Sequence, residues 1–236
     1  MSDPIQPPIL KAGRHLPSIV LFAVTTLGIL AADLLTKYLA FAHVAEHPIV
    51  LSRDANDGST VVQQRVDGEL ETLQPIVPDE PASALRDHRG VTVIPRLFAL
   101  KLTINTGAVF GLGKGAQWLF VVVTVAAVAF ILFVFGRTPA RARVMQVCQA
   151  LILGGALGNL YDRLLYNGVR DMCYLFPGVK LPLGLHWPGG ADELYPWIFN
   201  IADAALVIGV LVLLVATWVA EKNRAATGAD AVKQAA

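Results

Sequence analysis

The chain has 236 residues, of which 55% are hydrophobic, and its mean hydropathy of +0.56 is typical of an integral membrane protein. Its formal net charge of +1 creates no strong overall field, so we expect no nucleic-acid partner. The two cysteines, Cys148 and Cys173, fit no metal-ligand spacing and predict no disulfide framework.

Four apolar stretches are long enough to cross a bilayer, which takes roughly 20 helical residues. We predict membrane-spanning helices over about 17–42, 117–136, 144–162 and 197–219. Basic residues lie before the first span, between the second and third, and after the fourth, at Lys11, Arg14, Arg137, Arg141, Arg143, Lys222, Arg224 and Lys233. The positive-inside rule therefore predicts a multi-pass protein with both termini in the cytoplasm.

The first apolar stretch contains two charged residues, Asp33 and Lys37, which share one face of a helix and can form an ion pair. We favour a position for Lys37 in which its side chain extends to the membrane interface. For Asp33, a structural role and support of a functional site stay equally open. A cleaved signal peptide ending near Ala40-Phe41-Ala42 is the alternative for this stretch, but the stretch is long for that purpose and carries two charges.

The segment 43–116 is polar and acidic, and we expect it outside the cytoplasm. Alternating apolar residues flank Asp67-Gly68, which is a typical β-hairpin turn. We predict strands over 60–66, 69–73, 91–94 and 97–104, with an interruption at Pro95. The proline-rich stretch 74–90 predicts a mobile loop. A small β-sheet on the outer membrane face is the expected result.

The second outer segment, 164–196, is rich in proline and glycine, which excludes a long regular helix. Trp187, Tyr195 and Trp197 fit the aromatic belt found at membrane interfaces.

Polar residues gather where the outer segments meet the spans. Asn105 can cap the following segment or hold a substrate carbonyl, and Gly107 permits a close backbone approach. The small residues 154–158 predict tight helix packing. Asn159, Asp162 and Arg163 follow at the end of the third span, and a headgroup position is an open reading for Asp162 and Arg163.

Two aspartates occupy positions that a membrane chain usually avoids. Asp171 follows the third span after a turn at Gly168, and Asp203 lies one or two turns inside the fourth, where Asn200 is the better-placed helix cap. Ionisable side chains at membrane depth are costly and usually mark function. Two carboxylates that share one proton are the minimal apparatus of an aspartic protease.

Taken in order, these clusters resemble the pattern of the lipoprotein signal peptidases, or signal peptidase II. The pattern reads Asp…Lys, Asn-x-Gly-Ala-x-Phe, Gly-Asn-x-x-Asp-Arg, Val-x-Asp and Phe-Asn-x-Ala-Asp, and it covers 33–203 here. The resemblance implies an intramembrane aspartic endopeptidase of the bacterial cytoplasmic (inner) membrane. Such an enzyme cleaves the signal peptide of a prolipoprotein before a diacylglyceryl-modified cysteine.

The resemblance also implies roles for individual residues. Asp171 and Asp203 match the catalytic pair, and the residues matching its support are Asn105, Gly107, Asn159, Arg163, Asn200 and Asp33. The chain departs from the common pattern at Leu34, Val109 and Met172, where the family usually has Gln, Ala and Phe, and both outer segments are longer than usual.

The expected fold is mainly α: a single integral membrane domain over 1–236, with a four-helix transmembrane bundle and a small extracytoplasmic β-sheet. We expect a monomer that contacts membrane lipid and needs no cofactor or metal, since the five histidines show no zinc-binding spacing. A small proton-coupled transporter and an inactive binder of lipidated precursors remain the alternatives. The chain is short for an inverted-repeat transporter.

Overall fold

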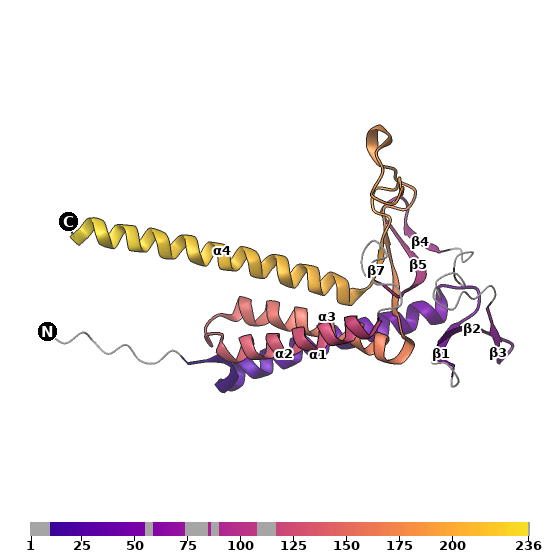
Figure 1. Cartoon of the computed structure of the whole chain (residues 1–236), viewed down its shortest axis with the longest axis horizontal. Helices are drawn as coiled ribbons and strands as arrows, with labels where there is room; N and C mark the ends of the chain where they lie inside the picture. The colour runs from indigo at the N-terminus through magenta and orange to yellow at the C-terminus, as the bar shows by residue number, and fades with distance from the viewer. Residues whose placement is uncertain (1–9, 55–58, 74–84, 86–89, 108–116, 236) are drawn as a thin grey trace.

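In the computed structural model, four long helices run side by side and two small sheets cover one end of the bundle (Figure 1). The structure describes residues 10–54, 59–73, 85, 90–107 and 117–235. The helices are α1 (Leu16–His43), α2 (Gln117–Arg137), α3 (Arg143–Tyr166) and α4 (Ile201–Ala235). Each contains a segment long and apolar enough to cross a membrane. The prediction of four spans is confirmed, and α1 begins and α4 ends at the end opposite the sheets.

Two helix boundaries differ from the prediction. Helix α3 continues to Tyr166, where Asn167 takes a left-handed conformation with φ 53° and ends the helix. Helix α4 begins at Ile201 rather than 197, because Ile198–Phe199 forms a short strand instead. The apolar run in the sequence conceals this change from strand to helix.

Helix α3 is the central helix of the bundle. In its apolar window 56% of the residues are buried, against 17% or less in the other three helices. Its small residues allow this, because a Cβ atom added at Gly154 would lie 2.8 Å from the Thr26 carbonyl oxygen of α1. A Cβ added at Gly155 would overlap the Ala202 carbonyl of α4. The tight packing predicted for 154–158 is confirmed.

The strands form two antiparallel sheets rather than the single one predicted. The first contains β1 (Ile49–Arg53), β2 (Thr60–Val66) and β3 (Glu69–Thr72), in the order β1-β2-β3. The second contains β4 (Val91–Ile94), β5 (Phe98–Asn105), β6 (Val169–Leu175) and β7 (Ile198–Phe199), in the order β4-β5-β6-β7. The hairpin at Asp67-Gly68 is confirmed, with φ angles of 50° and 90° as a two-residue turn of type I′ requires.

Strand β6 was not predicted, although it carries Asp171. All but its last residue are buried, so its sequence lacks the alternation that identifies a half-exposed strand. It pairs with β5 along most of its length, with Thr103 opposite Asp171. The expected loop 74–90 lies outside the described residues, apart from Leu85 and Gly90.

An apolar core joins the sheets to the C-terminal end of α1. It includes Phe41 of α1, Val62 of β2, Leu102 of β5 and Met172 of β6, all at most 3% exposed. A second apolar cluster closes the opposite end of the bundle, where Phe22 of α1 stacks on Phe135 of α2 with ring centroids 3.9 Å apart. The sheets are therefore packed onto the bundle through α1.

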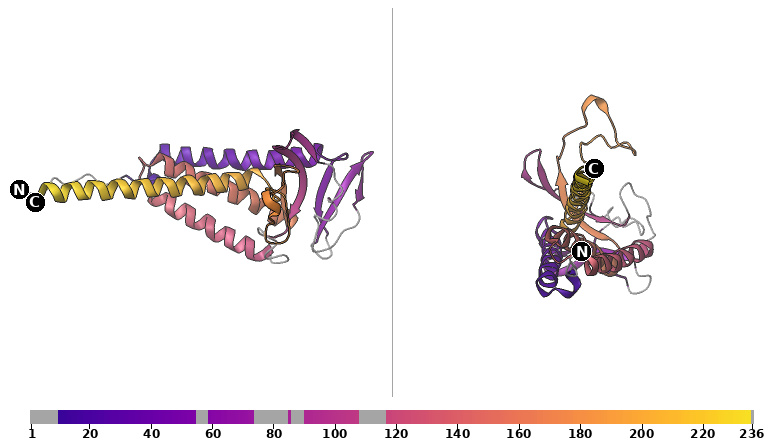
Figure 2. Two further views of the ribbon diagram at one scale, coloured as in Figure 1. Left: turned by 90° about the horizontal axis from the view of Figure 1, so that it is seen from above. Right: turned by 90° about the vertical axis from the view of Figure 1, so that its left-hand side faces the viewer.

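Between β6 and β7 the chain forms a long hairpin over residues 176–197, which we call the arm. It extends sideways past α4 and away from the other three helices (Figures 1 and 2). The described part of the expected outer segment 164–196 contains no long helix beyond the end of α3, only a short 3-10 helix at Pro182–Gly184.

Candidate active site

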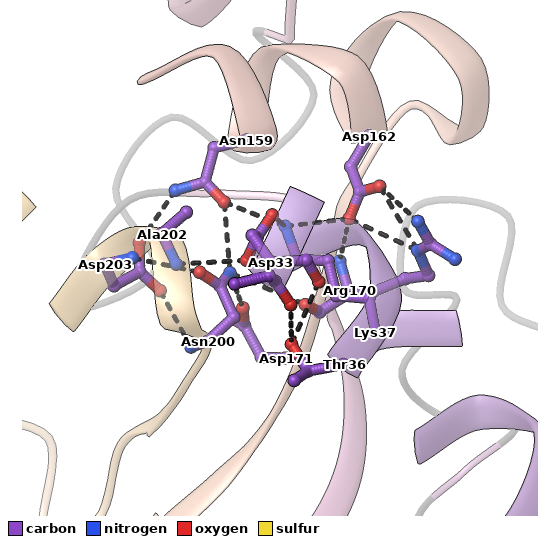
Figure 3. Close-up of polar contacts among 11 residues, drawn as sticks. Asp33, Thr36, Lys37, Asn159, Asp162, Arg170, Asp171, Asn200, Ala202 and Asp203 are labelled. Carbon is purple, nitrogen blue, oxygen red and sulfur yellow. Dashed lines mark hydrogen bonds and ion pairs between the residues drawn. The ribbon is translucent and has the colours of Figure 1, made fainter. Parts of the chain in front are cut away.

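Four elements bring polar side chains together where the bundle meets the second sheet (Figure 3). Helix α1 contributes Asp33 and Lys37, and α3 contributes Asn159 and Asp162. Strand β6 contributes Arg170 and Asp171, and the start of α4 contributes Asn200 and Asp203.

Two asparagine side chains bridge Asp171 and Asp203. Asn200 Nδ2 donates to Asp171 Oδ1 at 2.6 Å and to Asn159 Oδ1 at 3.0 Å. Asn159 Nδ2 donates to Asp203 Oδ1 at 2.8 Å. Asn159 and Asn200 therefore connect the two carboxylates by a short chain of hydrogen bonds (Figure 3), and Asn105 also forms a side-chain hydrogen bond with Asp171.

Neighbouring groups determine which way each amide faces. Lys37 Nζ donates to Asn159 Oδ1 at 3.2 Å, and an ammonium can only donate, so the Asn159 nitrogen must point to Asp203. Asn200 Oδ1 accepts the Asp203 backbone N–H at 3.0 Å, which leaves its nitrogen for Asp171. Both carboxylates are thus supplied with donors by preorganised groups.

Asn200 is the helix cap that the sequence predicted. The Asn200 backbone N–H donates in return to Asp203 Oδ2 at 3.2 Å, so the two residues form a reciprocal cap at the start of α4. Asp203 is only partly buried and sits in the first turn, where the helix dipole stabilises a negative charge.

Lys37 does not extend to the membrane interface, so that prediction is wrong. Its side chain is 0% exposed and its Nζ lies 2.7 Å from Asp33 Oδ2 and 3.2 Å from Asp162 Oδ2. The predicted Asp33–Lys37 pair is confirmed, and Asp33 Oδ1 also accepts the Ala202 backbone N–H at 3.0 Å. A buried ammonium needs such partners, because its desolvation is otherwise too costly.

Asp162 is also fully buried, which contradicts the headgroup position that the sequence left open. It accepts from Arg170 Nη2 at 2.8 Å and from the Arg170 backbone N–H at 2.9 Å. This bidentate pair joins α3 to β6 directly beside Asp171. The sequence reasoning did not select Lys37, Asp162 or Arg170 as site residues, although the Asp33–Lys37 spacing and the polar cluster ending the third span were available signals.

Arg163 is half-buried and lies within electrostatic range of Asp203, Asp171 and Asp162. Its guanidinium sits 5.2 Å from the Phe120 ring centroid, and its Nε has no hydrogen-bond partner among the described residues. If Asp171 and Asp203 share one proton, the remaining negative charges of the cluster are balanced by Lys37, Arg163 and Arg170.

The environment of Asp171 favours its neutral form. Burial raises the pKa of this carboxyl well above its usual value, and the negative charge of Asp203 raises the pKa further, while the Asn200 hydrogen bond acts in the opposite direction. Burial, together with the nearby carboxyls of Asp171, Asp203 and Asp33, also raises the pKa of the Cys173 thiol to about 11, so this cysteine is a neutral buried group.

Asn105 and Gly107 lie at the end of β5, next to the cluster. Asn105 pairs with Val169 across the sheet, so its side chain is on the same face as Asp171 and one diagonal step away. Asn105 Oδ1 accepts the Gly107 backbone N–H at 3.1 Å, which makes a local turn. Val109, one of the departures from the family pattern, lies outside the described residues.

An apolar groove of about 560 Å³ lies at the same end of the bundle as the polar cluster. It lies between the C-terminal end of α1 and the second sheet, and its lining includes Leu39, Ala40, Phe98, Leu100, Met172 and Ile201. Met172 and Ile201 bring the groove close in sequence to Asp171 and Asp203, although neither aspartate is part of its lining.

The chain is similar to known proteins over most of this region. Residues 76–219 match the family model described as "Signal peptidase (SPase) II". A "Lipoprotein signal peptidase" of Desulfitobacterium hafniense is 36% identical over 126 residues, covering 53% of this chain and 72% of that protein. One of Symbiobacterium thermophilum is 32% identical over 142 residues, covering 60% and 84%.

A solved structure titled "Bacterial membrane enzyme structure by the in meso method at 2.3 A resolution" has a similar fold. The TM-score is 0.53 at 22% identity, with 88% of this chain and 90% of that chain covered. The four helices and the small antiparallel sheets are therefore an arrangement shared with a solved membrane enzyme.

Proposed function

Because this chain belongs to the signal peptidase II family, we propose that Asp171 and Asp203 form the catalytic pair of an aspartic endopeptidase. The enzyme is a multi-pass bacterial membrane peptidase that removes signal peptides from prolipoproteins. The observation that carries the aspartic assignment is the hydrogen-bonded chain Asp171–Asn200–Asn159–Asp203. The surrounding charges balance when the two aspartates hold one proton between them.

Peptide hydrolysis by two carboxyls requires opposite protonation states. The ionised carboxylate takes a proton from a water molecule while the water oxygen attacks the peptide carbonyl carbon. The neutral carboxyl gives its proton to the carbonyl oxygen. Collapse of the tetrahedral intermediate then breaks the C–N bond: the proton taken from water passes to the leaving amine, and one hydroxyl of the intermediate returns its proton to the other carboxylate as the C=O bond of the product acid forms. The pair finishes with one proton, as it began.

We assign Asp171 as the initial acid and Asp203 as the initial base. The raised pKa of Asp171 supports a neutral carboxyl there. The ionised form of Asp203 accepts two hydrogen bonds, from Asn159 Nδ2 and the Asn200 backbone N–H, at the N-terminus of a helix. Asn159 and Asn200 are positioning residues in this mechanism, and Asp33 acts through Lys37.

The apolar groove is a reason to propose a lipid-modified substrate. A diacylglyceryl-cysteine beside the scissile bond would place an acyl chain near the two aspartates, where the groove offers about 560 Å³ of apolar space. Met172, which replaces the usual Phe of the family, is part of this lining and 2% exposed. Because the methionine side chain is flexible, the groove can adapt its shape to the acyl chain of the substrate.

The same proposal places both termini in the cytoplasm and the sheets on the outer face. The basic residues of the α2–α3 connection, Arg137, Arg141 and Arg143, support this orientation because they lie at the end of the bundle opposite the sheets. One chain supplies every residue of the hydrogen-bonded cluster, which supports a monomer as the active unit.

The test is cleavage of a diacylglyceryl-modified precursor by the purified full-length protein, followed by gel mobility. Asp171→Asn and Asp203→Asn should each lower turnover by a factor on the order of 10²–10⁴ or more, because each removes a proton-transfer group. Asp192→Asn is the matched control, since Asp192 is an exposed carboxylate paired with Lys180 on the arm. Wild-type turnover in either dyad variant would contradict the assignment, and binding without cleavage by the wild-type protein would identify an inactive binder.

A further inference from the structure

The arm between β6 and β7 is an ordered hairpin. Its two sides are joined by backbone hydrogen bonds from Leu181 to Asp192 at 2.8 Å and from Leu194 to Val179 at 2.7 Å. Lys180 Nζ and Asp192 Oδ2 form an ion pair at 2.6 Å across it. The Trp187 indole donates to the Glu193 carbonyl oxygen at 3.0 Å, which ties Trp187 to the returning side of the hairpin.

The tip of this hairpin presents leucines that the protein itself does not cover. Leu183 is 97% exposed and Leu185 is 56% exposed. Leu183 also has a φ of 60°, a left-handed conformation that is costly for a bulky residue, and Gly184 next to it has a φ of 70°. Neither packing within the described residues nor backbone preference explains a leucine at this position, and a contact outside the chain would cover it.

The direction of the arm indicates what that contact is. The arm starts at the end of the bundle where α4 begins and points away from the other helices, beyond the width of α4 (Figure 2). The neighbouring part of α4 exposes large apolar side chains, among them Val207, Ile208 and Leu211. In a membrane this surface of α4 faces lipid, and the arm overhangs that lipid.

Aromatic residues occupy the base of the arm. Trp187, Tyr195 and Trp197 contact one another edge to face, with ring centroids 4.7 Å and 5.2 Å apart. Such rings favour the headgroup level of a bilayer. The arm therefore combines an aromatic base, a polar pair at mid-length and an apolar tip.

We propose that the arm is a membrane-surface element whose tip, Leu183 and Leu185, inserts into the lipid interface beside α4. The lipid surface provides the apolar contact that the leucines lack, and the Lys180–Asp192 pair remains among headgroups and water. Because the arm connects β6 to α4, this contact holds the segment between Asp171 and Asp203 against the membrane. The proposal depends on the membrane location of the bundle and not on the chemistry of the two aspartates.

The test measures contact with lipid directly. Full-length protein carrying Leu183→Cys or Leu185→Cys is labelled with a maleimide fluorophore and reconstituted into vesicles of phosphatidylethanolamine and phosphatidylglycerol. The vesicles contain lipids with a nitroxide quencher either close to the headgroup or close to the end of the acyl chain. Glu69→Cys, on the exposed strand β3, is the control position, and the parent protein reports any labelling of the buried Cys148 and Cys173.

We expect both tip labels to be quenched several-fold more than the label at position 69, with the quencher near the headgroup more effective than the deep one. Quenching no greater than at position 69 would overturn the proposal, whether the tip then faces water or a second protein. The measurement needs no turnover and is repeated in the Asp171→Asn background, so its failure is distinguishable from failure of the aspartic mechanism.

Discussion

Lys37 is the residue on which the charged cluster depends. It lies between Asp33 and Asp162, and it also contacts the Asn159 amide that serves Asp203. One buried ammonium therefore contacts two carboxylates from two helices and sets the orientation of a bridging amide. The hydrogen bond that Asp203 receives from Asn159 therefore depends on Lys37, and so on the packing of α1 against α3.

Removing the Lys37 charge should therefore be costly. Lys37→Met leaves the buried Asp33 carboxylate without its cation and Asp162 with Arg170 alone, and we expect a loss of stability of about 3–5 kcal/mol, with lowered turnover. Thermal unfolding in detergent checks this. Lys180→Met, which removes the lysine of the exposed arm pair, should leave the stability nearly unchanged. Equal effects of the two substitutions would refute a special role for the buried pair.

The raised pKa of Asp171 makes a second prediction at the same scale. A carboxyl whose pKa is raised on folding binds its proton more tightly in the folded protein. Its contribution to stability is complete below the usual pKa of 3.8 and is lost as the pH rises through the folded value. The melting temperature of the wild type, relative to Asp171→Asn, should therefore fall as the pH rises above about 4.

Asp192 provides the control of opposite sign. The hydrogen bond from Lys180 lowers the pKa of this exposed carboxyl, so its small contribution is present above the usual pKa and is lost as the pH falls. The melting temperature of the wild type, relative to Asp192→Asn, should therefore rise weakly as the pH rises over the same range. The same trend in both variants would mean that Asp171 does not bind its proton more tightly on folding.

At the scale of elements, the close packing of α3 positions the site. Gly158 faces Asp33 of α1, and Gly155 faces the first turn of α4, which carries Asp203. The absence of side chains at these two positions lets α1 and α4 approach α3 closely enough for their polar groups to meet.

A single methyl group should therefore disturb both packing and activity. A Cβ at Gly158 would overlap the Asp33 carboxylate, and we expect Gly158→Ala to cost about 1–3 kcal/mol and to lower turnover. Gly28→Ala in α1 is the matched control, because a Cβ there meets nothing within 4 Å. That substitution should be neutral or stabilising by about 0.5–1 kcal/mol. Thermal unfolding and precursor cleavage compare the two, and an unchanged Gly158→Ala variant would contradict the packing argument.

At the scale of the whole molecule, the polar cluster, the groove and both sheets lie at one end of the bundle, and the basic connection between α2 and α3 lies at the other (Figure 1). This division of the molecule is what a peptidase needs when its substrate is anchored in the membrane and cut near one surface. It also makes the orientation of the protein measurable with two labels.

Cysteines placed at the two ends should report that orientation. In intact cells, an impermeant thiol reagent should label Glu69→Cys in β3 and should not label Ala142→Cys between α2 and α3. Both positions are at least partly exposed, whereas Thr138 in the same connection is buried and would resist labelling on either side. The reverse pattern would overturn the assignment of both termini to the cytoplasm.

The sequence by itself determined the spans, the β2–β3 hairpin, the Asp33–Lys37 pair and the cap at Asn200. Each of these depends on neighbours within a few residues: a continuous apolar run, a turn at Asp67-Gly68, an i,i+4 spacing, and an amide three residues before Asp203. The resemblance then pointed to Asp171 and Asp203, and the structure brings both into one hydrogen-bonded cluster.

The tertiary structure alone decided the features that depend on distant contacts. Strand β6 could not be predicted because it is buried on both faces and gives no alternating pattern. Lys37 was misplaced because its favourable partner Asp162 is 125 residues away in the chain, and the burial of Asp162 depends likewise on Arg170 across the α3–β6 connection. A charge can stay inside a membrane protein only when such partners meet it, and which partners meet is set by the packing of α1, α3 and β6.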